Sequence, residues 1–273
     1  MKPAAFEYLA PGSLDEAAAA LAREDAKILA GGQSLVPMMN FRLLAPSLLV
    51  DINRIPGLDY IENWDGGLRL GAMTRHHTVE MSALVQARFP VLSAAMAHVA
   101  HLAIRNRGTV GGSLCHGDPA AEWPGLAVLL DAVLKTTKRT IPAAQFHDGA
   151  LSTVLDDDEI LTEIQLPALP PGTGWGFEEF ARRSGDFAIA AVGVLLGDDV
   201  RIVAIGANAT PIRLSEAEAL FSFSGPPDID AVAAAAGRQV SPENDLHGSA
   251  DYRRHLVTVL TRRALRAAWE RAA

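Results

Sequence analysis

The alternation of apolar and polar positions divides the first 57 residues into a helix between two short strands. Ser13 and Glu16 have capping-box spacing, in which a hydroxyl and a carboxylate satisfy free amide donors, and an alanine-rich stretch to about Arg23 follows. The apolar runs 27–30 and 47–52 have the length of buried strands. This pattern predicts a small βαβ-like unit.

A second unit opens near Leu58. Its pattern favours a strand at 68–73, one apolar helix over 91–104, an apolar segment at 126–134 and a strand at 159–166. Paired prolines and glycines then mark 166–174 as the linker. Beyond it the pattern predicts a hairpin, two short helices and a long amphipathic helix, over residues 187–208, 216–221, 230–237 and 251–271. The chain is therefore expected to be α+β.

Composition excludes several classes of protein. With 49% apolar and 21% charged residues, the 273-residue chain is an ordinary globular protein rather than a disordered one. Its net charge of −8, without a Lys/Arg block, argues against nucleic acid as a partner. Residues 1–8 lack the apolar stretch of a secretory signal, and no apolar run is long enough for a membrane span. We expect a cytoplasmic protein.

Cysteine and histidine usage limits the metal chemistry of this chain. Cys115 is the only cysteine, which excludes an internal disulfide, a CxxC zinc site and an iron–sulfur cluster held by this chain alone. His98 and His101 lie three apart on the predicted helix, but no third ligand stands at useful spacing. Neither a Rossmann nor a P-loop glycine pattern is present.

Two similar glycine motifs carry the candidate chemistry. We call residues 30–34 (Ala-Gly-Gly-Gln-Ser) the first glycine motif and residues 109–113 (Thr-Val-Gly-Gly-Ser) the second glycine motif. Adjacent glycines let backbone N–H groups approach a ligand closely, and such a nest suits a diphosphate. A helical turn near Ser34, with Pro37 early in it, would add further amides.

These motifs, with the segments around them, closely resemble the FAD-binding medium subunits of molybdenum hydroxylases. This family includes aerobic carbon monoxide dehydrogenase and the flavin domain of xanthine dehydrogenase. The resemblance covers nearly the whole chain and rests on residues 30–42, 49–52, 105–113, 118–122, 177–188, 251–256 and 261–265.

The resemblance implies a two-part FAD-binding region of the vanillyl-alcohol oxidase (PCMH) type, followed by a smaller α+β C-terminal domain. Residues 1–57 and 58–170 would form the two FAD-binding subdomains, and residues 175–273 the C-terminal domain of the carbon monoxide dehydrogenase flavoprotein type. FAD would lie between the two subdomains.

Site residues follow from the same resemblance. The two motifs would hold the diphosphate and adjoining ribityl atoms, mostly through backbone amides of Ala30, Gly31, Gly32, Gln33, Ser34, Thr109, Val110, Gly111, Gly112 and Ser113. Glu122 stands where relatives usually place an Asp that contacts the cofactor, and Asp118 either caps the following turn or joins that contact. The strand containing Leu161 would pass near the isoalloxazine ring. Glu178 and Glu179 stand where some relatives carry a Lys close to the flavin.

The resemblance also implies partners. Electrons from a molybdopterin-binding large subunit would pass through two [2Fe-2S] clusters of a small subunit to FAD in this chain, and then to a quinone, NAD or oxygen. A dimer of heterotrimers is the family expectation. Two alternatives stay open: a flavin-free assembly subunit with the same fold, and a stand-alone flavin oxidoreductase. The second would need an acid/base residue near the ring, and His76 and His77 are the candidates by position, although they read as ordinary loop histidines.

Overall fold

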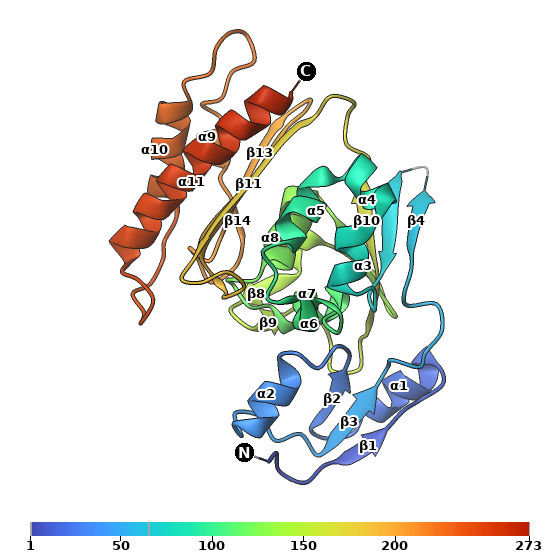
Figure 1. Cartoon of the computed structure of the whole chain (residues 1–273). Helices are drawn as coiled ribbons and strands as arrows, with labels where there is room; N and C mark the ends of the chain where they lie inside the picture. The colour runs from blue at the N-terminus through green and yellow to red at the C-terminus, as the bar shows by residue number, and fades with distance from the viewer. Residues whose placement is uncertain (1, 65, 273) are drawn as a thin grey trace.

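The computed structural model describes residues 2–64 and 66–272. The chain starts with a small lobe whose three parallel strands lie in the order β1-β3-β2, with β2 at one edge. Figure 1 shows this lobe in blue, below the rest of the molecule. Its elements are β1 (Glu7–Leu9), α1 (Leu14–Leu21), β2 (Ala26–Leu29), α2 (Leu35–Asn40) and β3 (Leu48–Asp51).

Helix α1 forms as its capping residues predict. The Ser13 hydroxyl accepts a hydrogen bond from the N–H of Glu16 (3.2 Å), while the Glu16 carboxylate turns back to accept from the N–H of Gly12 (2.9 Å). Ala17 and Leu21 on the inner face are buried against β3. The predicted βαβ-like unit is confirmed.

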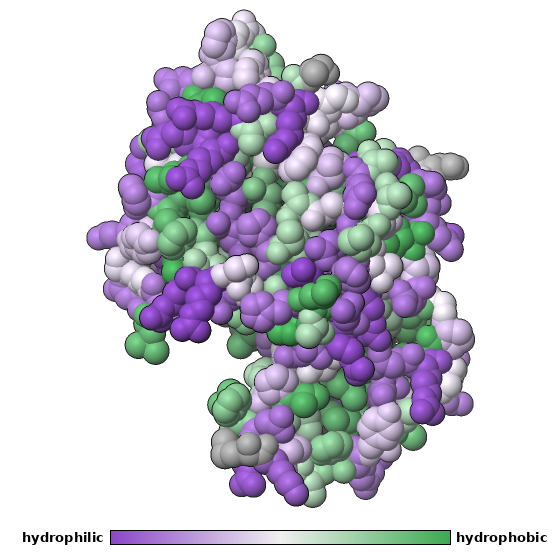
Figure 2. Space-filling view, viewed as in Figure 1, coloured by the Kyte–Doolittle hydropathy of each residue, from purple (hydrophilic) through white to green (hydrophobic). Residues whose placement is uncertain are grey.

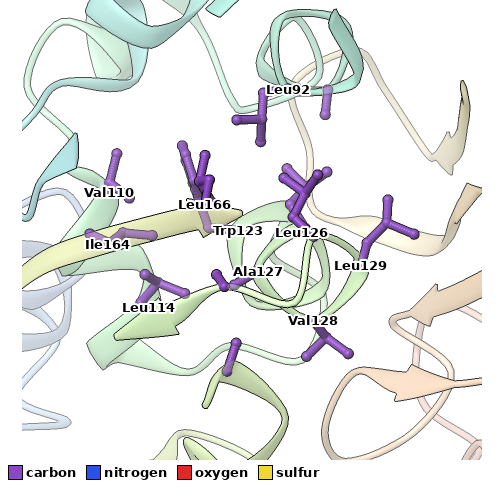
Figure 3. Close-up of a cluster of buried hydrophobic side chains, with 14 of the residues drawn as sticks. Leu92, Val110, Leu114, Trp123, Leu126, Ala127, Val128, Leu129, Ile164 and Leu166 are labelled. Atoms are coloured by element: carbon purple, nitrogen blue, oxygen red, sulfur yellow. The ribbon is translucent and has the colours of Figure 1, made fainter. Parts of the chain in front are cut away.

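The second unit contains a five-stranded sheet in the order β4-β5-β10-β6-β7. Six short helices and a two-stranded ribbon accompany it. The elements are β4 (Ile61–Trp64), β5 (Gly67–Gly71), α3 (His76–Met81), α4 (Ala83–Arg88), α5 (Pro90–Met96), α6 (Leu102–Arg105), α7 (Val110–His116), α8 (Glu122–Leu129), β6 (Val133–Thr136), β7 (Thr140–Pro142), a 3-10 turn (Ala143–Gln145), β8 (His147–Gly149), β9 (Ser152–Thr153) and β10 (Leu161–Pro167). Figure 3 shows the apolar side chains of α7 and α8 gathered beside Ile164 and Leu166 of β10.

The single helix predicted over 91–104 is wrong. The chain breaks after α5, and Ala100 takes a φ of +43°, which no residue with a side chain adopts readily within a helix. The Arg105 guanidinium holds this break by donating to the carbonyls of Val99 (3.0 Å) and Ala100 (2.9 Å). His98 and His101 therefore do not share a helix face.

The C-terminal unit is a four-stranded antiparallel sheet, β11-β12-β13-β14, covered on one face by α10 and α11. The predicted hairpin around Gly197 and the long terminal helix are confirmed. The elements are β11 (Gly174–Ala181), β12 (Ala188–Leu196), β13 (Val200–Ile205), β14 (Ile212–Arg213), α9 (Ser215–Glu218), α10 (Ile229–Gln239) and α11 (Ala250–Arg271).

The opposite face of this sheet packs on the second unit through α5 and α8. Leu129 of α8 and Ile205 of β13 belong to one buried cluster that crosses the boundary, and Gly125 and Gly193 allow the backbones to approach. In the described ranges, no helix has the length and apolar character needed to cross a membrane.

Candidate functional site

The two glycine motifs lie against each other, where the N-terminal lobe meets the second unit. A Cβ on Gly31 would collide with the carbonyl oxygen of Arg107 and lie 2.8 Å from the Cα of Gly108. A Cβ on Gly112 would lie 3.7 Å from the Cβ of Ala30. In Figure 2 the surface is hollowed into a notch on the left, between the lower lobe and the body. The structure therefore brings the two predicted motifs together.

A polar bridge fixes this contact. The amide nitrogen of Asn53 donates to the carbonyl of Ala30 (2.8 Å), and the guanidinium of Arg75 donates to the Asn53 side-chain oxygen (2.6 Å) and to the carbonyl of Arg107 (2.6 Å). Arg75 thereby ties the first motif to the segment that leads into the second. Sequence reasoning missed both residues, because nothing local to Asn53 or Arg75 signals a partner so distant along the chain.

The first glycine motif presents unpaired backbone donors. In the part of the chain that the structure describes, none of the N–H groups of residues 30–35 donates to a protein acceptor. Gly32 has a φ of +72°, and its carbonyl accepts from Val36 as α2 begins. The hydroxyl of Ser34 makes no capping bond. Backbone N–H groups left unpaired in this way can accommodate an anion.

The second glycine motif is not the loop that the sequence suggested. Thr109 is the N-cap of α7, and the motif forms the first turn of that helix. Val110 donates to Thr74 O (3.0 Å), and Gly111 donates to Ala72 O (2.8 Å). Gly112 and Ser113 donate to the hydroxyl and the carbonyl of Thr109, each at 3.0 Å. The N–H of Thr109 has no acceptor within residues 2–64 and 66–272.

The remaining predicted site residues, Asp118, Glu122 and Leu161, belong to the second unit. Asp118 accepts from the N–H of Ala120 (2.9 Å), so its carboxylate caps the turn before α8. Glu122 is the first residue of α8 and is only 5% exposed. Burial, with the charge of Asp118 adding to it, raises the pKa of Glu122 to about 7. Leu161 is buried at the start of β10, so only its backbone can face a ligand.

Glu179 is a second buried carboxyl, contributed by β11. Its side chain is 3% exposed, and burial together with the charge of Glu122 raises its pKa to about 8. The neighbouring Glu178 is in phase with Gly174 and Gly176, which face α11, so the two glutamates lie on opposite faces of β11.

The two histidine candidates have structural contacts. His76 is buried under Gly108, accepts a hydrogen bond from the Trp123 indole (2.9 Å), and has its pKa lowered by burial to about 4. His77 lies 3.1 Å from the Glu80 carboxylate. Both begin α3 rather than lying in a loop. Their contacts give no support to the stand-alone oxidoreductase.

Two family matches cover the chain. Residues 4–169 match the FAD binding domain in molybdopterin dehydrogenase, and residues 175–268 match the CO dehydrogenase flavoprotein C-terminal domain. The chain is 40% identical to the carbon monoxide dehydrogenase medium chain of Hydrogenophaga pseudoflava over 100% of both chains. It is 41% identical to the nicotine 6-hydroxylase medium subunit of Paenarthrobacter nicotinovorans, over 97% of this chain and 98% of the relative.

Solved structures agree with the sequence matches. Carbon monoxide dehydrogenase from Hydrogenophaga pseudoflava, in a form lacking the Mo-pyranopterin moiety, matches with a TM-score of 0.97 and 39% identity over 100% of both chains. Quinoline 2-oxidoreductase from Pseudomonas putida 86 matches with a TM-score of 0.92 and 36% identity, again over 100% of both chains. The chain therefore belongs to the FAD-binding medium subunits of the molybdenum hydroxylases, which confirms the resemblance, the α+β fold class and the FAD-dependent oxidoreductase function expected from its sequence.

Proposed function

We propose that the first glycine motif holds the FAD diphosphate and that the chain transfers electrons through this FAD within a molybdenum-containing dehydrogenase complex. The run of unpaired N–H groups at residues 30–35 carries the proposal. A diphosphate is an anion that accepts several hydrogen bonds, and Gly31 and Gly32 leave no side chain in the way of a close approach.

The second glycine motif contributes fewer donors in this proposal. The N–H of Thr109 and the side chain of Ser113 would reach the ligand, while Val110, Gly111 and Gly112 position them. Glu122, the backbone of Leu161 and the loop containing Asp118 would border the rest of the cofactor. FAD would span residues 1–57 and 58–170, with 175–273 as the C-terminal domain.

The proposed complex places the other cofactors on partner chains. Cys115 alone cannot hold an iron–sulfur cluster, so the [2Fe-2S] clusters belong to a small subunit and the molybdopterin to a large one. Relatives of this chain are named as medium subunits, and we propose a dimer of heterotrimers in the cytoplasm. Bound FAD would take electrons from the clusters and pass them to an external acceptor.

An absorption spectrum of the purified chain tests the proposal. We expect a flavin spectrum and FAD, identified by mass after denaturation, at about one per chain. A colourless chain is then titrated with FAD, alone and with its partner subunits. Failure of the folded, assembled chain to take up FAD would instead support the assembly-only alternative.

A further inference from the structure

The strand β11 directs one of two adjacent glutamates into the interior of the molecule. Gly174 and Gly176 face the backbone of α11, since a Cβ at either would meet it. The alternate positions, including Phe177, face the second unit and join its buried cluster. Glu179 continues this inward face, so its carboxyl lies at the junction between the second unit and the C-terminal sheet.

The Glu179 carboxyl lacks the partners that a buried charge needs. Among the described residues, its Oε2 is buried without a hydrogen-bond partner, and its Oε1 lies 3.7 Å from Nδ1 of His98. An isolated buried carboxylate is costly, and a protein ordinarily pairs it or keeps it protonated. Because neither oxygen of Glu179 has a hydrogen-bond partner in the described part of the chain to stabilise a negative charge, we expect this carboxyl to be protonated.

The helices and the strand packed around Glu179 supply no lysine or arginine, and the His98 imidazole is the basic group beside it. Neither α5, α8 nor β12 contains a lysine or arginine. The charged groups that face the pair are acidic: Asp118 acts on Glu122, and Glu178 acts on His98. The charge of Glu122 disfavours ionisation of Glu179, and without a lysine or arginine on the packed elements the two buried carboxyls cannot both ionise cheaply.

We propose that Glu122 and Glu179 hold one proton between them and that His98 connects this carboxyl pair to solvent, forming a proton path through the junction toward the proposed FAD site, which Glu122 borders. This inference rests on the proposed function, because it is the two-electron reduction of bound flavin that takes up at least one proton. The electrons come from the partner clusters, and the proton comes from solvent through His98. The path would keep charge balanced beside a carboxyl whose side chain is nearly inaccessible to solvent.

The protonation equilibria agree with this direction of transfer. Burial lowers the pKa of His98, opposed by Glu178, so the imidazole is neutral and able to accept a proton at pH 7. The His98 side chain is 41% exposed, whereas that of Glu179 is 3% exposed. A proton entering from solvent therefore meets His98 first.

Whether the carboxyl pair holds a proton can be tested without flavin, by measuring the thermal stability of the chain as a function of pH. Because the pKa of Glu179 rises from 4.5 to about 8 on folding, the folded chain binds more protons than the unfolded chain between these values. Stability therefore falls as pH rises through this window. We expect the Tm of the full flavin-free chain to fall by several degrees more between pH 5.5 and 9 than that of Glu179→Gln. Glu178→Gln, one residue away, is the control and should keep the wild-type profile above pH 7, where His98 is neutral.

The flavin-loaded chain tests the path itself. Glu179→Gln and Glu122→Gln should each displace the pH at which the midpoint potential of bound FAD changes slope. His98→Gln should leave the potential unchanged but slow proton uptake, followed with a pH indicator dye during reduction, at least severalfold.

The outcomes separate the two proposals. Failure to bind FAD would overturn the proposed function, while the flavin-free stability profile would still decide whether the pair holds a proton. Wild-type pH profiles for both Glu variants, of stability and of potential, would overturn the carboxyl pair. If Glu179→Gln only weakens FAD binding, Glu179 is a ligand contact and the proton path is wrong. An unchanged rate of proton uptake in His98→Gln would overturn the route through His98.

Discussion

Residues 30–34 and 109–113 each contain two adjacent glycines and end in a serine, and they lie against each other, but their backbone N–H groups differ in hydrogen bonding. Residues 30–35 keep every N–H without a protein acceptor within the described ranges, whereas four of the five N–H groups of the second motif are already bonded. The adjacent glycines therefore allow another backbone or a ligand to approach closely. The surrounding fold determines whether the N–H groups bond to the protein or remain free for a ligand.

The position of each motif in its sheet explains the difference. The first motif continues β2, which lies at the edge of its sheet, so no strand is present on one side to accept its N–H groups. The second motif follows Thr109, which forms a β-bridge with Arg75, and its next residues run along Ala72 and Thr74. A neighbouring backbone therefore satisfies the second motif before any ligand arrives.

Gly111→Val should have the largest effect. A Cβ at this position would lie 2.7 Å from the Cβ of Ala72 and 2.8 Å from its carbonyl oxygen, so α7 must move away from β5. We expect a loss of about 3 kcal/mol of stability, at the upper end of core overpacking, with FAD lost only as a consequence. Denaturant unfolding measures this. The control, Gly225→Val, has no atom within 4 Å of its Cβ and should be near neutral.

If Gly111→Val kept wild-type stability and lost only FAD, the second motif would be a ligand-binding motif like the first. The comparison between the two motifs would then fail.

Gly32→Val should reduce FAD binding while the chain stays folded, the reverse of Gly111→Val. Its φ of +72° costs a residue with a Cβ about 1–2 kcal/mol, and relaxing that strain would turn the peptide and its N–H away from the ligand. We expect FAD affinity, measured by flavin fluorescence titration, to fall more than about tenfold while the fold persists. Gly57→Val is the control for the backbone strain, because Gly57 has a φ of +78°; its Cβ would lie in open space, whereas a Cβ at Gly32 would lie 3.2 Å from Leu29 and 3.3 Å from Val36. Equal FAD binding in both variants would count against the first motif.

Local signals in the sequence predicted the parts of the fold that local contacts determine. The cap at Ser13 and the turn at Gly197 each act over a few residues, and the elements beside them are confirmed. The break at Ala100 could not be predicted, because it depends on the Arg105 guanidinium reaching back to two carbonyls. β11 was also missed, since its glycines weaken a strand pattern and are needed only for contact with α11.

The candidate site divides in the same way. Adjacent glycines signalled both motifs, but hydrogen bonding to Ala72 and Thr74 is a tertiary property that no local pattern carries. The sequence could not distinguish Glu178 from Glu179, because only the register of β11 determines which of the two side chains is buried. The protonation of these carboxyls depends on their burial, and burial is determined by the tertiary structure rather than by neighbouring residues in the sequence.

Arg75→Ala should loosen the contact between the motifs without unfolding either. The variant loses the donors to Asn53 and to the carbonyl of Arg107, and hydrogen bonds from a charged donor contribute about 1.5–3 kcal/mol when buried. Since this site is partly exposed, we expect FAD affinity to fall about five- to tenfold. Calorimetric titration measures it. Arg69→Ala, which removes a surface ion pair with Glu62 and a contact with the Tyr60 ring, should bind FAD normally. A matching loss in both variants would refute the bridge.

Ser34→Ala and Thr109→Ala give the smallest and most selective contrast. The Ser34 hydroxyl has no capping bond, so its removal should leave stability unchanged and weaken FAD binding by about 0.5–1 kcal/mol, roughly two- to fivefold. The Thr109 hydroxyl accepts from Gly112, so Thr109→Ala should cost about 1 kcal/mol of stability, which Thr109→Ser restores. Unfolding and FAD titrations of both variants should therefore show that Ser34→Ala loses affinity and keeps stability, while Thr109→Ala loses stability. If both variants lost affinity and neither lost stability, ligand contact would govern the two motifs alike, and the edge position of β2 would not distinguish them.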